Sequence, residues 1–275
     1  MVRIALGIEY DGSAYSGWQQ QAHARSVQAE LQRALAGVAT HEVTLTAAGR
    51  TDAGVHALMQ VAHFDTSAMR PEHAWSLGAT AESAADVTVL WAREVPEHFH
   101  ARHAALFRTY VYRILNRPMR PALDRLRVCW VRRPVDASAM HTAAQSLIGE
   151  HDFTSFRAAE CQSTTPMRRM QCVTVERDGE EVEITVRANA FLHHMVRNIA
   201  GSLILVGAGE RPAEWLARAL AARDRTQAGP TAPPQGLYFA GVEYDEQFAL
   251  PCRPRPSGRL RANPPGDSPG PGSRR

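Results

Sequence analysis

One ten-residue stretch collects side chains that can do chemistry and that a hydrophobic core does not need. It reads Ala48-Gly49-Arg50-Thr51-Asp52-Ala53-Gly54-Val55-His56-Ala57. Glycine permits a positive φ or a close approach of the backbone to a ligand, arginine is a fixed cation, and Asp52 can serve as a nucleophile, a base or an ion-pair partner. The stretch therefore predicts either a catalytic loop or a surface turn whose aspartate caps the next element.

The sequence predicts both strands and helices around this loop. Val2, Ile4, Leu6, Ile8 and Tyr10 alternate with smaller or polar residues, which predicts a strand with one buried face. Ser26 is typical of an N-cap, and the apolar spacing after it predicts a helix. The other elements expected in the first hundred residues are strands at 43–46, 59–64 and 87–95 and a helix at 71–77.

The following residues repeat this mixture of elements. Asp136 is expected to cap a helix that ends at Gly149, and Asp178-Gly179 is a strong hairpin signal between two apolar runs. The remaining elements expected here are strands at 107–116, 173–175, 182–186 and 237–244 and helices at 191–206 and 212–222. The simplest assembly is an α+β protein of two halves, 1–103 and 104–249, that meet around a cleft.

Residues 250–275 are rich in Pro, Gly, Ser and Arg and contain few apolar residues, so a disordered tail is expected. The sequence has no run of about 18 apolar residues and begins directly with a strand pattern, which favours a cytoplasmic protein without a membrane span. Cys129, Cys161, Cys172 and Cys252 form no Cys-x-x-Cys pair, which indicates reduced thiols and argues against a zinc framework.

The positive charge is concentrated in one segment. The chain carries a formal charge of +3, and its 31 basic residues are all arginine. Residues 101–133 hold nine of these arginines and a single acidic residue, Asp124. A local field of this kind favours binding of a polyanion, although a solvated surface is the alternative.

Seven blocks of the chain form a recognisable pattern. The first is the Gly-Arg-Thr-Asp loop. The other blocks are Ile8-Glu9-Tyr10-Asp11-Gly12 with Gly17-Trp18-Gln19, Ser26-Val27-Gln28, Phe99-His100-Ala101-Arg102, Arg108-Thr109-Tyr110-Val111-Tyr112, Asp152-Phe153-Thr154-Ser155-Phe156-Arg157, and Asn189-Ala190-Phe191-Leu192-His193-His194-Met195-Val196-Arg197-Asn198-Ile199. In these blocks and in their order, the chain resembles the tRNA pseudouridine synthases of the TruA family, and the match extends from about residue 3 to about residue 250.

The resemblance implies a fold, an activity and a set of roles. The fold is the pseudouridine synthase fold, in which two related α+β subdomains share an extended, mainly antiparallel sheet. The family acts as a homodimer without a cofactor and modifies positions 38, 39 and 40 in the anticodon stem-loop of tRNA. Asp52 would be the covalent catalyst, Arg197 its cationic partner, and Arg50 the residue that replaces the flipped-out base.

The resemblance also assigns residues to the substrate and the RNA. Tyr110 would stack on the target uracil and act at C5, whereas the strand pattern alone allows Tyr110, Tyr112 and Ile114 all to be core. The segment Thr80-Ala81-Glu82-Ser83-Ala84, Pro118 and Thr164 depart from the family pattern. The expected tRNA contacts are Arg70, Phe99, His100, Ala101, Arg102, His103, Glu160, Cys161, Gln162, Ser163 and Thr164.

Two alternatives to this activity and one further type of site were considered from the residues alone. A noncatalytic RNA-binding protein of the same fold would explain the arginines and leave the Asp52 loop unused. A glycoside hydrolase would need a second carboxylate, and Asp11 and Asp152 have ready capping roles. The histidines of the chain invite a metal site, but none is expected, because His193 and His194 as helix neighbours would point about 100° apart.

Overall fold

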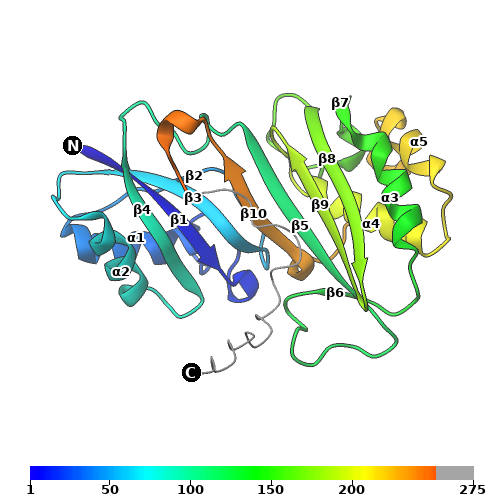
Figure 1. The fold of residues 1–275 in the computed structure, drawn as a ribbon, viewed down its shortest axis with the longest axis horizontal. Coiled ribbons are helices and arrows are strands. Elements are labelled where there is room, and N and C mark those ends of the chain that lie inside the picture. The colour runs from blue at the N-terminus through cyan, green and yellow to red at the C-terminus, as the bar shows by residue number, and fades with distance from the viewer. Residues whose placement is uncertain (252–275) are drawn as a thin grey trace, which may run out of the picture.

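A continuous ten-stranded sheet runs through the part of the chain that the computed structural model describes, residues 1–251 (Figure 1). The strand order is β4-β1-β3-β10-β5-β9-β8-β7, with β2 added to β3 and β6 to β5. The strands are β1 (Val2–Tyr10), β2 (Thr46–Ala47), β3 (His56–Thr66), β4 (Val87–Val95), β5 (Phe107–Asn116), β6 (Cys129–Val131), β7 (Gly149–Asp152), β8 (Met167–Asp178), β9 (Glu181–Ala188) and β10 (Leu237–Glu243).

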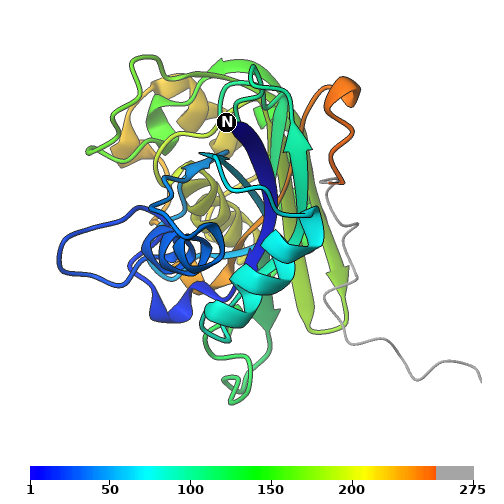
Figure 2. The same ribbon diagram turned by 90° about the vertical axis from the view of Figure 1, so that its left-hand side faces the viewer.

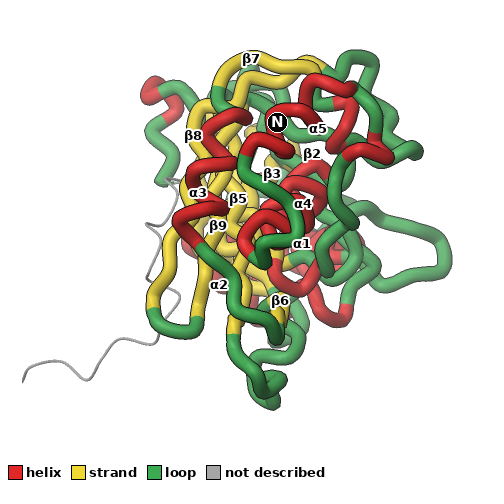
Figure 3. Tube along the Cα trace, turned by 90° about the vertical axis from the view of Figure 1, so that its right-hand side faces the viewer, coloured by secondary structure: helices red, strands yellow, loops and turns green. Residues whose placement is uncertain are grey.

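The helices lie in two groups on one face of the sheet (Figures 2 and 3). One group packs beside β4 and the other beside β5 and β8. The first group consists of α1 (Val27–Ala39) and α2 (Glu72–Glu82), and the second of α3 (Ala137–Ala144), α4 (Met195–Gly207) and α5 (Glu214–Ala222). This arrangement confirms the α+β class.

Strand β10 joins the two halves of the sheet. It pairs in parallel with β3, where Tyr238 lies opposite His56, and antiparallel with β5, where Phe239 lies opposite Tyr110. All but one of the other strand pairs are antiparallel, the exception being β5 with β6. The hydrogen-bond ladder therefore continues from the first half into the second without an edge between them.

The alternating residues of β1 and one face of α1 form the core of the first half. Ile8, Leu31 and Leu35 are completely buried. Burial of such a side chain contributes about 1.5–3 kcal/mol to stability. The sequence pattern predicted this face because strand and helix periods place those residues on one side.

Several local signals act as the sequence predicted. Ser26 caps α1 by accepting a hydrogen bond from the amide of Ala29 at 3.3 Å, and Asp136 caps α3 through the amides of Ser138 and Ala139. Gly179 has φ +58° at the tip of the hairpin between β8 and β9. Strands β4 and β5 have the expected bounds, 87–95 and 107–116.

The strand expected at residues 43–46 is wrong over most of its length. Only Thr46 and Ala47 pair with β3, as strand β2. The backbone of Leu45 makes its hydrogen bonds with side chains of α1 instead. Its amide donates to Gln32 Oε1 and its carbonyl accepts from Gln28 Nε2, both at 3.0 Å. Side chains of the helix thus replace the strand ladder, which a local pattern does not reveal.

Two expectations concern the ends of the chain and the membrane. The tail expected at 250–275 lies, apart from its first two residues, outside the described residues. Within residues 1–251, no helix has both the length and the apolar character needed to cross a bilayer.

Candidate active site

Three segments of the first half fix the loop that carries Asp52. The buried Gln60 amide donates to the carbonyl of Gly49 at 2.7 Å, and the hydroxyls of Tyr10 and Thr51 lie 2.8 Å apart. The amide of Trp18 donates to the carbonyl of Thr51 at 3.0 Å. The residues immediately before Asp52 are thereby held from both sides, so the orientation of the loop is set before any ligand arrives.

The two glycines of the loop serve different purposes. Gly54 has φ +76°, a left-handed conformation that favours glycine. Gly49 does not, but a Cβ atom there would lie 3.3 Å from the ring of Phe239 and 3.8 Å from the hydroxyl oxygen of Tyr110. Gly54 therefore makes the turn, and Gly49 lets the loop pack closely against the ring of Phe239, beside the hydroxyl of Tyr110.

Asp52 forms an ion pair with an arginine of the opposite half of the molecule. Its Oδ2 lies 3.1 Å from Nη1 of Arg197, whose Nε donates to the carbonyl of Ala232 at 2.8 Å. The side chains of Asp52 and Arg197 are only 23% and 13% exposed. The ion pair that the resemblance implied is present, and the second donor of the guanidinium fixes its direction.

Two histidines complete the surroundings of Asp52. The Nε2 atom of His193 lies 3.4 Å from Oδ1, and that of His194 lies 3.3 Å from Oδ2. The two rings are 4.0 Å apart between centroids. The sequence predicted that His193 and His194, as neighbours in a helix, could not bind the same metal ion. That prediction is wrong in its geometry, because α4 begins at Met195 and neither histidine lies within the helix.

The backbone of His194 explains this later start of α4. His194 has φ +61°, a left-handed conformation that is uncommon for residues other than glycine and that recurs at functional sites as well as at helix ends. Burial lowers the pKa of His194, and the neighbouring His193 and Arg197 lower it further, whereas Asp52 and Glu160 oppose this change. A neutral imidazole therefore faces Asp52 at pH 7.

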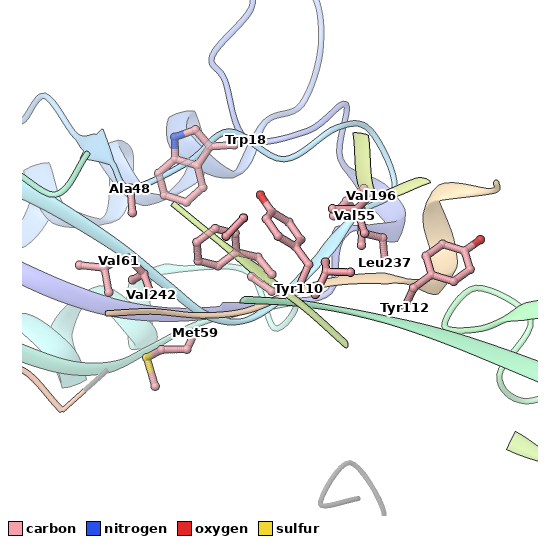
Figure 4. Packing of buried hydrophobic residues seen from close by; sticks show 14 of the residues in the cluster. Trp18, Ala48, Val55, Met59, Val61, Tyr110, Tyr112, Val196, Leu237 and Val242 are labelled. Atoms are coloured by element: carbon pink, nitrogen blue, oxygen red, sulfur yellow. The ribbon is translucent and has the colours of Figure 1, made fainter. Parts of the chain in front are cut away.

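Tyr110 lies at the centre of the sheet beneath the loop. Its ring contacts those of Phe191 and Phe239 edge to face, each with centroids 5.0 Å away. Figure 4 shows its hydroxyl pointing off the sheet on the side where Trp18 lies. Burial raises the pKa of Tyr110 well above its ordinary value, and the charge of Asp52 adds to this. The hydroxyl therefore keeps its proton at neutral pH.

The neighbours of Tyr110 in the strand belong to the core. Tyr112 and Ile114 are completely buried, and the hydroxyl of Tyr112 donates to the carbonyl of Pro233 at 2.8 Å. Tyr110 is also largely buried, with 8% of its surface exposed, but it lines the cleft and they do not. The strand face is thus divided between core and site.

A cleft of about 880 Å³ surrounds these groups and receives residues from both halves. Its volume falls in the range of small-molecule sites. Among the residues that line it are Trp18, Arg50, Asp52, Arg102, Arg108, Tyr110, Glu160, Cys161, Gln162, Ser163, His193, His194 and Arg197.

The expected RNA contacts are divided between the cleft and other places. Arg50, Arg102 and the segment 160–163 line the cleft, and Arg50 is exposed. Thr164, Arg70 and His103 are not among the lining residues. Phe99 and Ala101 are completely buried, and the half-buried ring of His100 packs against His63 and His103. Phe99 and Ala101 therefore support the loop from within, and their side chains are not available to a ligand.

Fewer arginines of the segment 101–133 are available to bind an anion than its composition suggested. Four of its nine arginines form ion pairs with carboxylates from other segments: Arg113 with Glu181, Arg117 with Glu180, Arg127 with Asp11 and Arg133 with Glu210. The charge counted along the sequence overstates the field because these acidic partners lie outside residues 101–133. The family departure at 80–84 lies at the end of α2 and does not line the cleft.

Sequence reasoning missed Arg108 as a residue that positions the site. Its guanidinium donates to the carbonyls of Ala48 at 3.3 Å, Arg102 at 2.5 Å and Asn189 at 2.6 Å. These carbonyls belong to the Asp52 loop, the loop before β5 and the segment before α4. The signal was available, because Arg108 opens one of the seven blocks, but only its charge was considered.

Comparison with known proteins agrees with this geometry. A family model described as tRNA pseudouridine synthase matches residues 7–103 and 143–245. Proteins named tRNA pseudouridine synthase A from Xanthomonas campestris pv. campestris (strain B100) and Xylella fastidiosa (strain M23) are each 56% identical, over 91% of this chain and 98% of their own length. The one from Methylococcus capsulatus (strain Bath) is 55% identical over 90% and 92%. The chain therefore belongs to the tRNA pseudouridine synthase family.

Proposed function

We propose that this protein isomerises uridine to pseudouridine at positions 38, 39 and 40 in the anticodon stem-loop of tRNA, with Asp52 as the nucleophile. The observation that carries the proposal is the carboxylate of Asp52, largely shielded from water and paired with Arg197, in a cleft that also presents Tyr110. Family membership supports tRNA as the substrate.

The reaction suits this set of residues because it exchanges nothing with a second substrate. The N1–C1′ bond of the uridine breaks, the uracil turns over, and C5 bonds to C1′ while the C5 hydrogen leaves as a proton and N1 takes one up. A nucleophile must hold one fragment during the turn, and an acid–base group must act at C5. Asp52 supplies the first function, and Arg197 stabilises its charge.

We assign two roles to Tyr110, stacking on the uracil and acid–base chemistry at C5. Its ring offers a face for stacking, and its hydroxyl points off the sheet into the cleft region. Because burial keeps the hydroxyl protonated, it takes the C5 proton only as its own proton passes to water in the cleft, and water supplies the proton that N1 takes up. Arg50, exposed at the cleft, would fill the position that the flipped nucleotide leaves in the stem.

RNA docking would use the exposed groups at the cleft margin, chiefly Arg50, Arg102 and the segment 160–163. The enzyme is proposed to work in the cytoplasm as a homodimer and without a cofactor. Asp11 and Asp152 hold capping hydrogen bonds to Ser13 and Thr154, which leaves neither free as the second carboxylate of a hydrolase.

Tritium release from tRNA labelled at uracil C5 tests the proposal, because only substitution at C5 frees that hydrogen. Asp52→Asn should bind tRNA in a filter assay and lose essentially all release, since the amide has the same shape but is not a nucleophile. The matched control is Asp178→Asn at the end of β8, the same change of carboxylate to amide at a residue that pairs with Glu181 in the hairpin and does not line the cleft.

The control should release tritium at the rate of the unaltered protein. Release by Asp52→Asn within about tenfold of that rate, which is about 1.4 kcal/mol in the barrier, would exclude Asp52 as the nucleophile. Binding of tRNA without release by the unaltered protein would instead support a noncatalytic RNA-binding protein.

A further inference from the structure

The carboxylate of Asp52 and the imidazoles of His193 and His194 place three potential metal ligands at one point. Nε2 of His193 and Nε2 of His194 lie 3.4 and 3.3 Å from the oxygens of Asp52, and one ligand atom from each of the three residues lies within 4.8 Å of the others. Among residues 1–251 this is the one such group of three or more His, Cys, Asp or Glu residues.

These distances agree with tetrahedral zinc coordination. Zinc binds histidine nitrogen and carboxylate oxygen at about 2.0–2.2 Å, so two ligand atoms of a tetrahedral site lie roughly 3.3–3.5 Å apart. The distance from His193 Nε2 to Oδ1 already has this value, whereas His194 Nε2 lies 3.3 Å from the other oxygen, Oδ2. For one ion to be bound by Oδ1 and both imidazoles, the ring of His194 must turn toward Oδ1; the rings of His193 and His194 lie beside each other, with centroids 4.0 Å apart.

The ligand set leaves a fourth position toward the cleft. Two histidines and one carboxylate with an open position form a common arrangement in zinc proteins. All three residues line the cleft, so an ion can enter from solvent. The carboxylate has two oxygens, and Arg197 can keep its contact with Oδ2 while the metal takes Oδ1.

We propose that Asp52, His193 and His194 bind a divalent transition metal ion such as Zn²⁺, and that the bound ion inhibits the enzyme. Inhibition follows because the ion occupies the carboxylate that the reaction uses. This consequence rests on the proposed function, whereas the binding of the ion does not.

The neighbouring charges make the binding reversible. Arg197 repels a cation and competes for the same carboxylate, while Glu160, which is close enough to affect His194 electrostatically, attracts one. Mg²⁺ prefers oxygen ligands in an octahedron and is therefore a poor occupant of a site with two imidazoles. The site should therefore bind zinc in preference to magnesium, even though magnesium accompanies tRNA.

Binding is tested on the metal-free full-length protein without RNA. Titration calorimetry with Zn²⁺ and the visible absorption of Co²⁺ should show one tetrahedral ion per chain. His193→Gln and Asp52→Asn should each weaken binding by about 100-fold or more, because loss of an outer-shell partner alone costs about 10- to 100-fold. His103→Gln is the control, since the His100–His103 pair also stacks closely, at 4.2 Å, but without a carboxylate.

Binding that is equally strong in all these variants would overturn the proposal, as would an octahedral Co²⁺ spectrum that ignores them. For inhibition, Zn²⁺ should stop tritium release by the unaltered enzyme, EDTA should restore it, and Mg²⁺ should have no such effect. The activity that His193→Gln retains should need about 100-fold more Zn²⁺ for half inhibition.

The two proposals fail in different ways. A protein that binds zinc through Asp52 and the histidines but never releases tritium contradicts the proposed function and leaves the metal site intact. An active enzyme that zinc inhibits equally in the unaltered protein and in His193→Gln contradicts the metal site alone.

Discussion

Removal of one oxygen from Tyr110 separates its chemical role from its structural one. In the described part of the chain, the structure gives the hydroxyl of Tyr110 no hydrogen-bond partner, and the ring contacts with Phe191 and Phe239 do not involve it. Tyr110→Phe should therefore change the free energy of unfolding by less than about 0.5 kcal/mol. If the hydroxyl acts at C5, single-turnover tritium release should fall by about 100-fold, or about 2.7 kcal/mol in the barrier.

A larger substitution should also remove the packing. Each edge-to-face aromatic pair is worth about 0.5–1.5 kcal/mol, so Tyr110→Leu, which breaks two of them, should destabilise the protein by about 1–3 kcal/mol. It should also weaken tRNA binding if the ring stacks on the flipped base, since such stacking contributes about 1–3 kcal/mol.

Tyr112→Phe is the matched control in the same strand. Its hydroxyl donates to the carbonyl of Pro233 at 2.8 Å, so its removal should cost about 1–3 kcal/mol of stability and leave single-turnover release unchanged. Urea unfolding and single-turnover release on both variants give opposite patterns if the reasoning holds. Full release by Tyr110→Phe would refute the chemical role and leave Tyr110 as a packing residue.

Two further predictions concern charge. Arg197→Met should lower single-turnover release by about 100-fold or more with little loss of tRNA binding, because it removes the cation 3.1 Å from Asp52; equal losses of binding and release would place Arg197 at the RNA instead. The second prediction concerns His63 and the pH dependence of stability. Burial lowers the pKa of His63 to about 4 in the folded protein, so between pH 6.5 and 4 the imidazole is protonated in the unfolded chain and neutral in the folded one. Stability is therefore full above pH 6.5 and falls as the pH drops toward 4, by up to about 3.4 kcal/mol in urea unfolding. His63→Gln should remove that part of the slope, whereas the exposed control His73→Gln should not.

The sequence predicted those elements whose signal is local. Strand β4 and strand β5 alternate cleanly, and Ser26 and Asp136 cap their helices through amides two or three residues away. The Asp52 loop was equally visible, since a run of polar and glycine residues between apolar strands has few structural uses. The pairing of Asp52 with Arg197, 145 residues apart, came from family resemblance, because no local pattern specifies such a contact.

What the sequence did not predict depends on distant segments. A helix was expected to begin at Phe191, and the histidines were accordingly placed on different sides of it. The backbone of His194 is left-handed instead; histidine adopts this conformation more often than most residues, but the preference is too weak to predict one position from the sequence. Arg108 was misjudged for the same reason, since its value lies in the carbonyls of three separate segments.

The position of β10 couples the site to the middle of the sheet. Ala232, five residues before β10, donates its amide to the carbonyl of Arg197 at 3.1 Å and accepts from Nε of the same residue at 2.8 Å. The arginine is thus held through both its backbone and its side chain by the segment that leads into the central strand. Because β10 pairs with β3, which follows the Asp52 loop, and with β5, which carries Tyr110, one strand sets the relative positions of all three residues. A shift of β10 would therefore move the cation, the carboxylate and the tyrosine apart together, so the catalytic geometry depends on the pairing of the two halves.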